Sequence, residues 1–306
     1  MKLSKSTRIY IAGCGGMLGD AVYKHFRDIA HVKATDINVN EEWLSYADVR
    51  DYRGALESLE SFRPDIVINL AALTDLEQCE RDPDNAWCTN ALGAENLALM
   101  SSRLDAVHVY ISTAGVFDGG QSLYTEFDAP RPLNVYGRSK YYGEAAIPQR
   151  VPRHFVIRAG WMMGGGPAKD KKFINKLFQK IRAGARELSV VDDKFGSPTY
   201  TVDFARGIQV LVESELYGLY HQSGEGSNSR YEVAQEFVRL LGLEQSVTIK
   251  KVDSTFFEGE YFATRPTSEG LVNFKLRARG LNVMREWRVC LEEYSRIFRE
   301  DLESRR

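Results

Sequence analysis

The chain has 306 residues, 43% of them hydrophobic, enough to bury one large α/β domain or a nucleotide-binding domain with a smaller one appended. Its 40 basic and 42 acidic residues are interspersed, so the charge pattern favours neither a nucleic acid polymer nor a membrane as a partner. The four cysteines lack C-x-x-C spacing, and the N-terminal apolar stretch is too short for a signal peptide. We therefore expect a cytoplasmic protein without a structural zinc site.

The first half of the chain alternates short apolar runs with amphipathic stretches, a pattern typical of a parallel sheet covered by helices. A strand is expected at residues 8–12, followed by a glycine turn and a helix to about Phe26. Further strands are expected at 32–35, 65–70, 107–112 and 155–158, with helices at 52–62, 83–102 and 134–146, the last closed by Pro148.

Beyond residue 160 the pattern loosens. We expect helices at 173–182 and 202–212, strands at 188–191 and 218–222, a helix capped by Ser227 or Ser229 that ends near Gly242, and a charged helix at 285–303 with a solvated face. The sequence thus predicts a doubly wound, Rossmann-like parallel α/β sheet and a smaller C-terminal α/β lobe. The expected division is 5–160 with 197–222 for dinucleotide binding, and 161–196 with 223–306 for substrate binding.

A glycine-rich turn follows the first expected strand and opens the first expected helix. Gly13, Gly16 and Gly19 have the spacing that permits a tight turn, close approach of a pyrophosphate and close helix packing. The free N–H groups of such a helix start attract phosphate without a lysine. We expect the dinucleotide to contact Gly13, Gly15, Gly16, Met17, Leu18 and Gly19. A tight turn without a ligand is the alternative.

Asp36 ends the second expected strand, where a carboxylate can accept hydrogen bonds from a ribose diol and repel a 2′-phosphate. The cofactor is therefore expected to be NAD(P)H, with a weak preference for NADH. Two alternatives stay open: Asp36 starts a turn, or Lys33 accommodates the phosphate.

Tyr136 is the tyrosine that has a lysine four positions later, and both residues lie in an expected helix. One helical turn separates them, so their side chains share a face, and a positive charge on Lys140 would stabilise a phenolate. The preceding strand ends at Ser112 and Thr113, at the sheet edge where doubly wound folds place ligands. We expect Thr113 to polarise a substrate carbonyl, Tyr136 to protonate it and the cofactor to deliver hydride.

Competing chemistry finds little support. The five histidines lack metal-ligand spacing, so no metal site is expected, and the G-x-S-x-G motif of hydrolases is missing.

With these residues assembled, the sequence resembles the dTDP-4-dehydrorhamnose reductase family of extended short-chain dehydrogenases/reductases over nearly its whole length. The motifs that carry the resemblance are the glycine turn, 68–72 with Thr74, 90–91, 112–113, 132–140 with 143–144, Arg158 with Trp161, 196–199 and 265–266. The resemblance implies reduction of the 4-keto group of a nucleotide-linked deoxysugar, with catalytic roles for Thr113, Tyr136 and Lys140. It implies a dinucleotide site that includes Asp48, Val49, Leu70, Ala71, Ala72, Asn90, Tyr136 and Lys140, and a sugar-nucleotide site at Thr74, Thr113, Trp161 and Arg265.

One departure from the family concerns the residues after the catalytic threonine. The family usually has Asp-Tyr there, whereas this chain has Ala114 and Gly115, so a carboxylate and a phenol beside the substrate are lost. The identity of the sugar therefore stays open, and a 4,6-dehydratase is disfavoured. A sugar-nucleotide epimerase with bound NAD and a non-catalytic, dinucleotide-binding regulatory subunit remain as alternatives, and a homodimer is left open.

Overall fold

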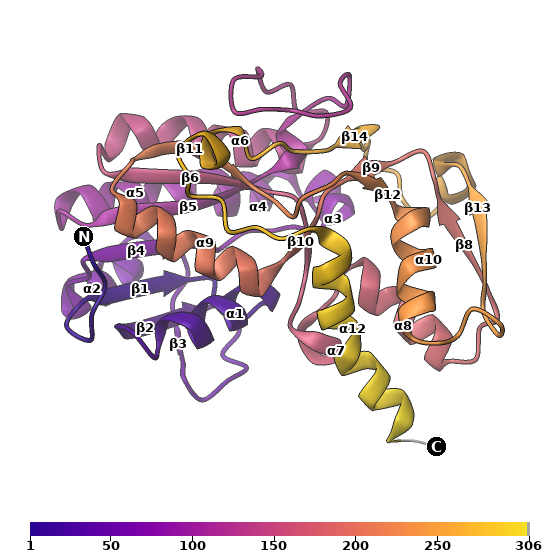
Figure 1. Cartoon of the computed structure of the whole chain (residues 1–306). Coiled ribbons are helices and arrows are strands. Elements are labelled where there is room, and N and C mark those ends of the chain that lie inside the picture. The colour runs from indigo at the N-terminus through magenta and orange to yellow at the C-terminus, as the bar shows by residue number, and fades with distance from the viewer. Residues whose placement is uncertain (305–306) are drawn as a thin grey trace.

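A seven-stranded parallel sheet forms the larger part of the computed structural model, which describes residues 1–304 (Figure 1). The strand order is β3-β2-β1-β4-β5-β6-β11. Their bounds are β1 Arg8–Ala12, β2 His31–Asp36, β3 Leu44–Tyr46, β4 Ile66–Asn69, β5 Val107–Thr113, β6 His154–Ala159 and β11 Gly218–Gln222. From β1 the sheet is extended on one side by β2 and β3 and on the other side by β4 and the later strands. The glycine turn after β1 therefore lies at the switch point of the strand order. The predicted doubly wound α/β class is confirmed.

Helices cover both faces of this sheet. The helices α1 (Met17–Phe26) and α9 (Thr201–Ser214) pack together over one face, against core side chains such as Ile11, Ile68 and Phe155. On the opposite face lie α2 (Tyr52–Phe62), α5 (Gly93–Arg103) and α6 (Val135–Arg150). All four residues of β4 are buried, as its continuous apolar run predicts for a strand covered on both sides.

A second hydrophobic core organises the smaller lobe. It joins α8 (Phe173–Arg182), α10 (Arg230–Leu240) and α12 (Trp287–Glu303) through buried rings such as Phe178, Phe237 and Phe298. Two parallel strands, β8 (Glu187–Val191) and β13 (Thr248–Val252), pack beside these helices. Short strands link the two parts: β7 (Trp161–Met163) with β10 (Pro198–Tyr200), and β9 (Phe195–Gly196) with β12 (Asn228–Ser229) and β14 (Ser268–Glu269).

The remaining elements are short, and four of them are helices: α3 (Leu76–Arg81), α4 (Pro83–Trp87), α7 (Gly166–Lys169) and α11 (Phe274–Ala278). The first two precede α5, and α11 packs against β11 at the edge of the sheet. Within residues 1–304, no helix combines the length and apolar character needed to span a bilayer. The division into 5–160 with 197–222 and 161–196 with 223–306 stays a proposal.

Two expected helices differ from the observed ones. The helix expected over 83–102 is divided by a π-helical turn at Cys88–Leu92, where the buried Asn90 bonds to a neighbouring loop. Pro148 was expected to close its helix, but α6 continues to Arg150. The proline removes one donor near the end, yet Val151 N–H still donates to the carbonyl of Ile147, so the last turn survives.

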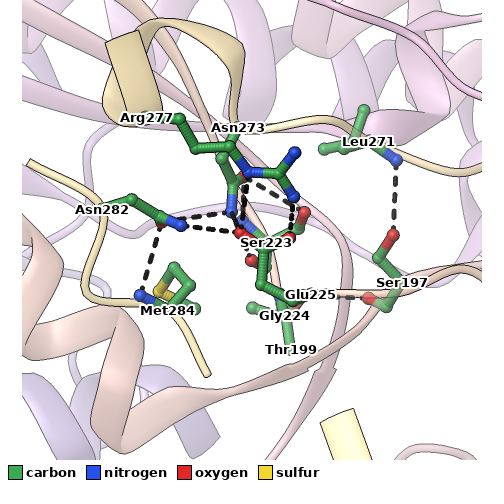
Figure 2. A network of polar contacts seen from close by, with 10 residues as sticks. All are labelled: Ser197, Thr199, Ser223, Gly224, Glu225, Leu271, Asn273, Arg277, Asn282 and Met284. Carbon is green, nitrogen blue, oxygen red and sulfur yellow. Dashed lines mark hydrogen bonds and ion pairs between the residues drawn. The ribbon is translucent and has the colours of Figure 1, made fainter. Parts of the chain in front are cut away.

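A buried polar network fastens the chain after β14 to the end of β11 (Figure 2). The side chain of Asn273 accepts from the backbone N–H of Ser223 at 2.9 Å and donates to its carbonyl at 2.8 Å. In the same network, Leu271 N–H donates to Ser197 Oγ at 3.3 Å. The segment that follows β14 is therefore held in two places. Asn273 binds it to the end of β11, and Leu271 binds it to Ser197, between β9 and β10.

Candidate active site

The turn between β1 and α1 requires glycine. Gly13 has a φ of +75°, and a Cβ there would overlap the backbone of Ala71, which follows β4. A Cβ on Gly19 would likewise overlap the carbonyl of Cys14, inside the turn itself. These two glycines let β1, α1 and the chain after β4 approach closely at the switch point.

The start of α1 fits a dinucleotide phosphate. Gly16 is the N-cap residue, and no side chain in the described part of the protein caps the helix, so the N–H groups of Met17, Leu18 and Gly19 are available. A Cβ at Gly16 would meet no atom within 4 Å in the described residues beyond its own neighbours in the chain. Free donors beside open space suit an anion at the positive end of a helix.

Asp36 lies at the end of β2 and faces this turn. Its Oδ2 accepts from the N–H of Gly15 at 2.8 Å, and Oδ1 accepts from the N–H of Asn38 at 2.8 Å. Lys33 points elsewhere, because its Nζ donates to the carbonyl of Ser58 on α2 at 3.2 Å. Asp36 therefore stabilises two turns, while Lys33 is engaged away from the carboxylate.

The other expected dinucleotide residues surround the ends of β3 and β4. Leu70, Ala71 and Ala72 directly follow β4, and Asn69 Oδ1 accepts from the N–H of Ala71 at 3.0 Å. Asp48 follows β3 and forms an ion pair with Arg50, which lowers the pKa of the carboxyl group. Two residues of the set lie in the interior: Val49 is 6% exposed and Asn90 is 0% exposed.

Asn90 has a structural task in this arrangement. Its Oδ1 accepts from Leu73 N–H at 2.8 Å, and its Nδ2 donates to Leu73 O and to Ser139 Oγ, each at 3.0 Å. Ser139 belongs to α6, three residues after Tyr136. The Asn90 side chain, which is expected to line the dinucleotide site, thus ties the loop after β4 to α6.

Thr113 and Tyr136 come together at the carboxyl end of β5. Burial raises the pKa of the Tyr136 phenol to about 12; a side-chain hydrogen bond with Thr113 opposes this rise, and the charge of Glu269 adds to it. Thr113 Oγ1 also accepts from the N–H of Gly115 at 3.0 Å, which orients the hydroxyl. Tyr136 is accordingly a neutral phenol near neutral pH, the protonation state that a proton donor needs.

Lys140 is buried one turn further along α6. Its Nζ donates to the carbonyl of Ile111 at 2.6 Å and lies 4.1 Å from the centroid of the Tyr110 ring. Burial lowers the pKa of Lys140 to about 7, against a raising effect of Glu144. The ammonium group was expected to lower the pKa of Tyr136, but burial of the phenol outweighs any such effect.

The lobe contributes charged side chains that the sequence motifs did not single out. Trp161 Nε1 donates to Glu269 Oε2 at 2.7 Å, and the guanidinium of Arg230 lies 4.1 Å from the centroid of the Trp161 ring. Arg230 follows the capping residue Ser229 of α10, and Glu269 belongs to the two-residue strand β14. Only the three-dimensional arrangement brings them beside Trp161, because 69 and 108 positions separate them from it in sequence.

The remaining two expected substrate residues have protein partners. Thr74 Oγ1 accepts from Lys172 Nζ at 3.0 Å, so a lysine of the lobe reaches the loop after β4. Arg265 forms an ion pair with the Glu77 carboxylate: Nη2 donates a hydrogen bond to Oε2 at 2.9 Å, and Nη1 lies 2.8 Å from Oε1. The guanidinium that the resemblance placed beside a pyrophosphate is therefore already paired.

A doubly wound sheet with this glycine turn at its switch point, and with a Tyr-x-x-x-Lys helix beside β5, defines the class of NAD(P)-dependent short-chain dehydrogenases/reductases. Residues 7–299 match the family model described as the RmlD substrate binding domain. The chain belongs to this family, the dTDP-4-dehydrorhamnose reductases, as its motifs indicated.

Individual relatives agree with this assignment. The chain is 34% identical to the spore coat polysaccharide biosynthesis protein SpsK of Bacillus subtilis, over 94% of this chain and 96% of that protein. It is 31% identical to dTDP-4-dehydrorhamnose reductase of Mycobacterium tuberculosis, over 94% of this chain and 92% of the relative. The crystal structure of the Bacillus anthracis reductase in complex with NADP superimposes with a TM-score of 0.86 at 31% identity, covering 96% of this chain and 99% of that one.

Proposed function

We propose that this protein uses NAD(P)H to reduce the 4-keto group of a nucleotide-linked deoxysugar, with Tyr136 as the proton donor. The observation that carries the proposal is that Thr113 and Tyr136 converge at the carboxyl end of β5, where Thr113 Oγ1 and the Tyr136 ring both border the space beside Gly115. This pair lies at the edge of the sheet where the glycine turn is also found, so one ligand can reach both.

The dinucleotide would be held by the turn between β1 and α1. The free N–H groups at the start of α1 bind its pyrophosphate, and Gly13 and Gly16 keep side chains out of the way. The chain after β4, with Leu70, Ala71 and Ala72, provides an apolar wall. When bound, NAD(P)H supplies the hydride that converts the carbonyl carbon to a secondary alcohol.

Protein side chains supply the proton. Thr113 donates a hydrogen bond to the carbonyl oxygen, and Tyr136 transfers its phenolic proton to that oxygen as the alkoxide charge develops. The positive charge of Lys140, one helical turn further along α6, stabilises the resulting phenolate. Because the pKa of Lys140 is about 7, this lysine can exchange a proton near neutral pH and help restore the phenol.

For the cofactor, we propose a weak preference for NADH. The support is Asp36, whose carboxylate lies where an adenosine ribose would bind and would repel a 2′-phosphate. Lys33 is engaged with Ser58 and does not offset this charge. The Bacillus anthracis relative binds NADP. If the Asp36 carboxylate disfavours NADPH by repelling its 2′-phosphate, Asp36→Ala should improve the use of NADPH relative to NADH.

The test is a screen of dTDP-, GDP-, CDP- and UDP-linked 4-keto-6-deoxysugars, with the absorbance of NADH and NADPH followed separately. The proposal predicts stoichiometric oxidation of one of the two cofactors with at least one of these sugars. An epimerase would instead retain tightly bound NAD and interconvert sugars without consuming NADH. A regulatory subunit would bind the dinucleotide and turn over none of the sugars, and either result would overturn the proposal.

A further inference from the structure

A carboxylate of the lobe faces the same small space as the proposed catalytic pair. A Cβ placed on Gly115 would lie 3.4 Å from Thr113 Oγ1, 3.5 Å from Glu269 Oε1 and 3.6 Å from Tyr136 Cε1. All three atoms therefore lie within 3.6 Å of a single point beside Gly115. The family usually carries a tyrosine at position 115, and glycine leaves this space open in the present chain.

Glu269 is oriented by its neighbours. Oε2 accepts the hydrogen bond from Trp161 Nε1, whereas Oε1 has no hydrogen-bond partner among residues 1–304. The chain on either side is also fixed. Ser268 Oγ donates to Ser122 O at 2.6 Å. Leu271 N–H donates to Ser197 Oγ at 3.3 Å, as Figure 2 shows. The carboxylate is thus preorganised with one oxygen directed at the site.

The environment favours a hydrogen-bond donor as the partner of Oε1. No ion pair of Glu269 occurs in the described structure. Burial lowers the pKa of the nearby Arg230, and the charge of Glu269 opposes that shift. A carboxylate that is partly buried and lacks a partner on one oxygen gains most from a charge-assisted hydrogen bond. On a sugar ring, the donors next to a carbonyl are hydroxyl groups.

We propose that Glu269 is a specificity-determining residue whose Oε1 accepts a hydrogen bond from the hydroxyl on a ring carbon adjacent to the reacting carbonyl. The inference rests on the proposed function, because Thr113 and Tyr136 fix the carbonyl and thereby the position of its neighbouring hydroxyl. The family usually has an aspartate where this chain has Ala114, so a site without a carboxylate was expected. In this proposal Glu269, from a distant segment, supplies the carboxylate.

The test compares two 4-keto substrates, one with a 3-hydroxyl group and one that is 3-deoxy, using the full chain with its cofactor. The variants are Glu269→Ala, Glu269→Gln and, as a control in the same lobe, the exposed Glu258→Ala. Loss of a charge-assisted hydrogen bond should lower kcat/KM of Glu269→Ala for the hydroxy substrate by about 10- to 100-fold. The 3-deoxy substrate should change by less than about threefold, Glu269→Gln should be intermediate, and Glu258→Ala should behave as wild type.

The outcomes separate this proposal from the proposed function. If the wild type reduces the sugars but Glu269→Ala lowers kcat/KM equally for both, Glu269 only supports the fold and the proposal is overturned alone. An equal effect of Glu258→Ala would overturn it as well, since the effect would not be local. If the wild type reduces neither sugar, the proposed function fails and the role of Glu269 fails with it.

Discussion

The guanidinium of Arg158 forms a buried ion pair with the carboxylate of Glu144, in which Nε donates to Oε2 at 3.0 Å. The two side chains are only 2% and 7% exposed, and Ser112 Oγ donates to the same carboxylate oxygen at 2.8 Å. Arg158 lies on β6, Ser112 on β5 and Glu144 on α6. The pair therefore holds the helix of Tyr136 and Lys140 against the strand that ends in Thr113.

Glu144→Gln should destabilise the protein strongly. The variant removes the charge that compensates Arg158, and an uncompensated buried charge costs about 3–5 kcal/mol. The matched control is Glu95→Gln, because Glu95 pairs with Arg150 of α6 at a more exposed position, where Arg150 is 43% exposed. That loss should stay below about 1 kcal/mol in urea unfolding. Equal losses for the two variants would show that the buried pair does not fasten α6.

Gly13→Ala and Gly16→Ala should separate folding from cofactor binding. Alanine at position 13 requires a positive φ and overlaps Ala71, so it should lower the melting temperature. The methyl group of alanine at position 16 meets no atom within 4 Å in the described chain beyond its own neighbours in sequence, so the melting temperature should stay unchanged. Its methyl group should nevertheless weaken NAD(P)H binding by about tenfold or more, measured by calorimetry. Unchanged affinity in Gly16→Ala would place the pyrophosphate elsewhere.

Lys140→Met should lower turnover and raise the stability of the folded protein. Because burial lowers the pKa of Lys140 to about 7, the unfolded chain binds more protons at this site than the folded protein between pH 7 and about 10.5. The wild type should therefore gain stability from this lysine's titration as the pH rises through that window. Methionine removes the cost of a buried ammonium group, so the variant should be the more stable of the two at pH 6.

The measurement for this prediction is the difference in unfolding free energy between Lys140→Met and wild type at several pH values. The difference should be largest below pH 7 and shrink towards pH 10, while turnover falls. A difference that stays constant with pH would argue that Lys140 titrates normally. Lys176→Met, at an exposed lysine on α8, provides the control.

Much of the sheet could be predicted from local sequence. The apolar residues Ile66, Val67 and Ile68 indicate a strand covered on both faces, as β4 is. The glycine spacing that begins at Gly13 indicates the tight turn at which β1, α1 and the chain after β4 approach one another. The spacing of Tyr136 and Lys140 likewise follows from one helix. Such features depend on neighbours in the chain, so a sequence pattern can report them.

The side chains that the smaller lobe contributes to the site, such as Glu269 and Arg230, could not be predicted in this way. Glu269 belongs to a strand of two residues, and its role depends on Trp161 and on the polar network shown in Figure 2. The hydrogen bonds of the Asn90 amide with Leu73 and Ser139 could not be predicted either, because only the packed structure brings these residues together. Contacts between segments far apart in the chain leave no periodic signal.

The central claim is that the Tyr136 phenol protonates the substrate, and single-turnover reduction by Tyr136→Phe tests it most directly. Tyr141→Phe serves as the control, since Tyr141 lies on the same helix and is 36% exposed. The account predicts that Tyr136→Phe still binds NAD(P)H but loses about 100-fold or more in the rate of reduction. A Tyr136→Phe variant that reduces the sugar as fast as Tyr141→Phe would contradict the account.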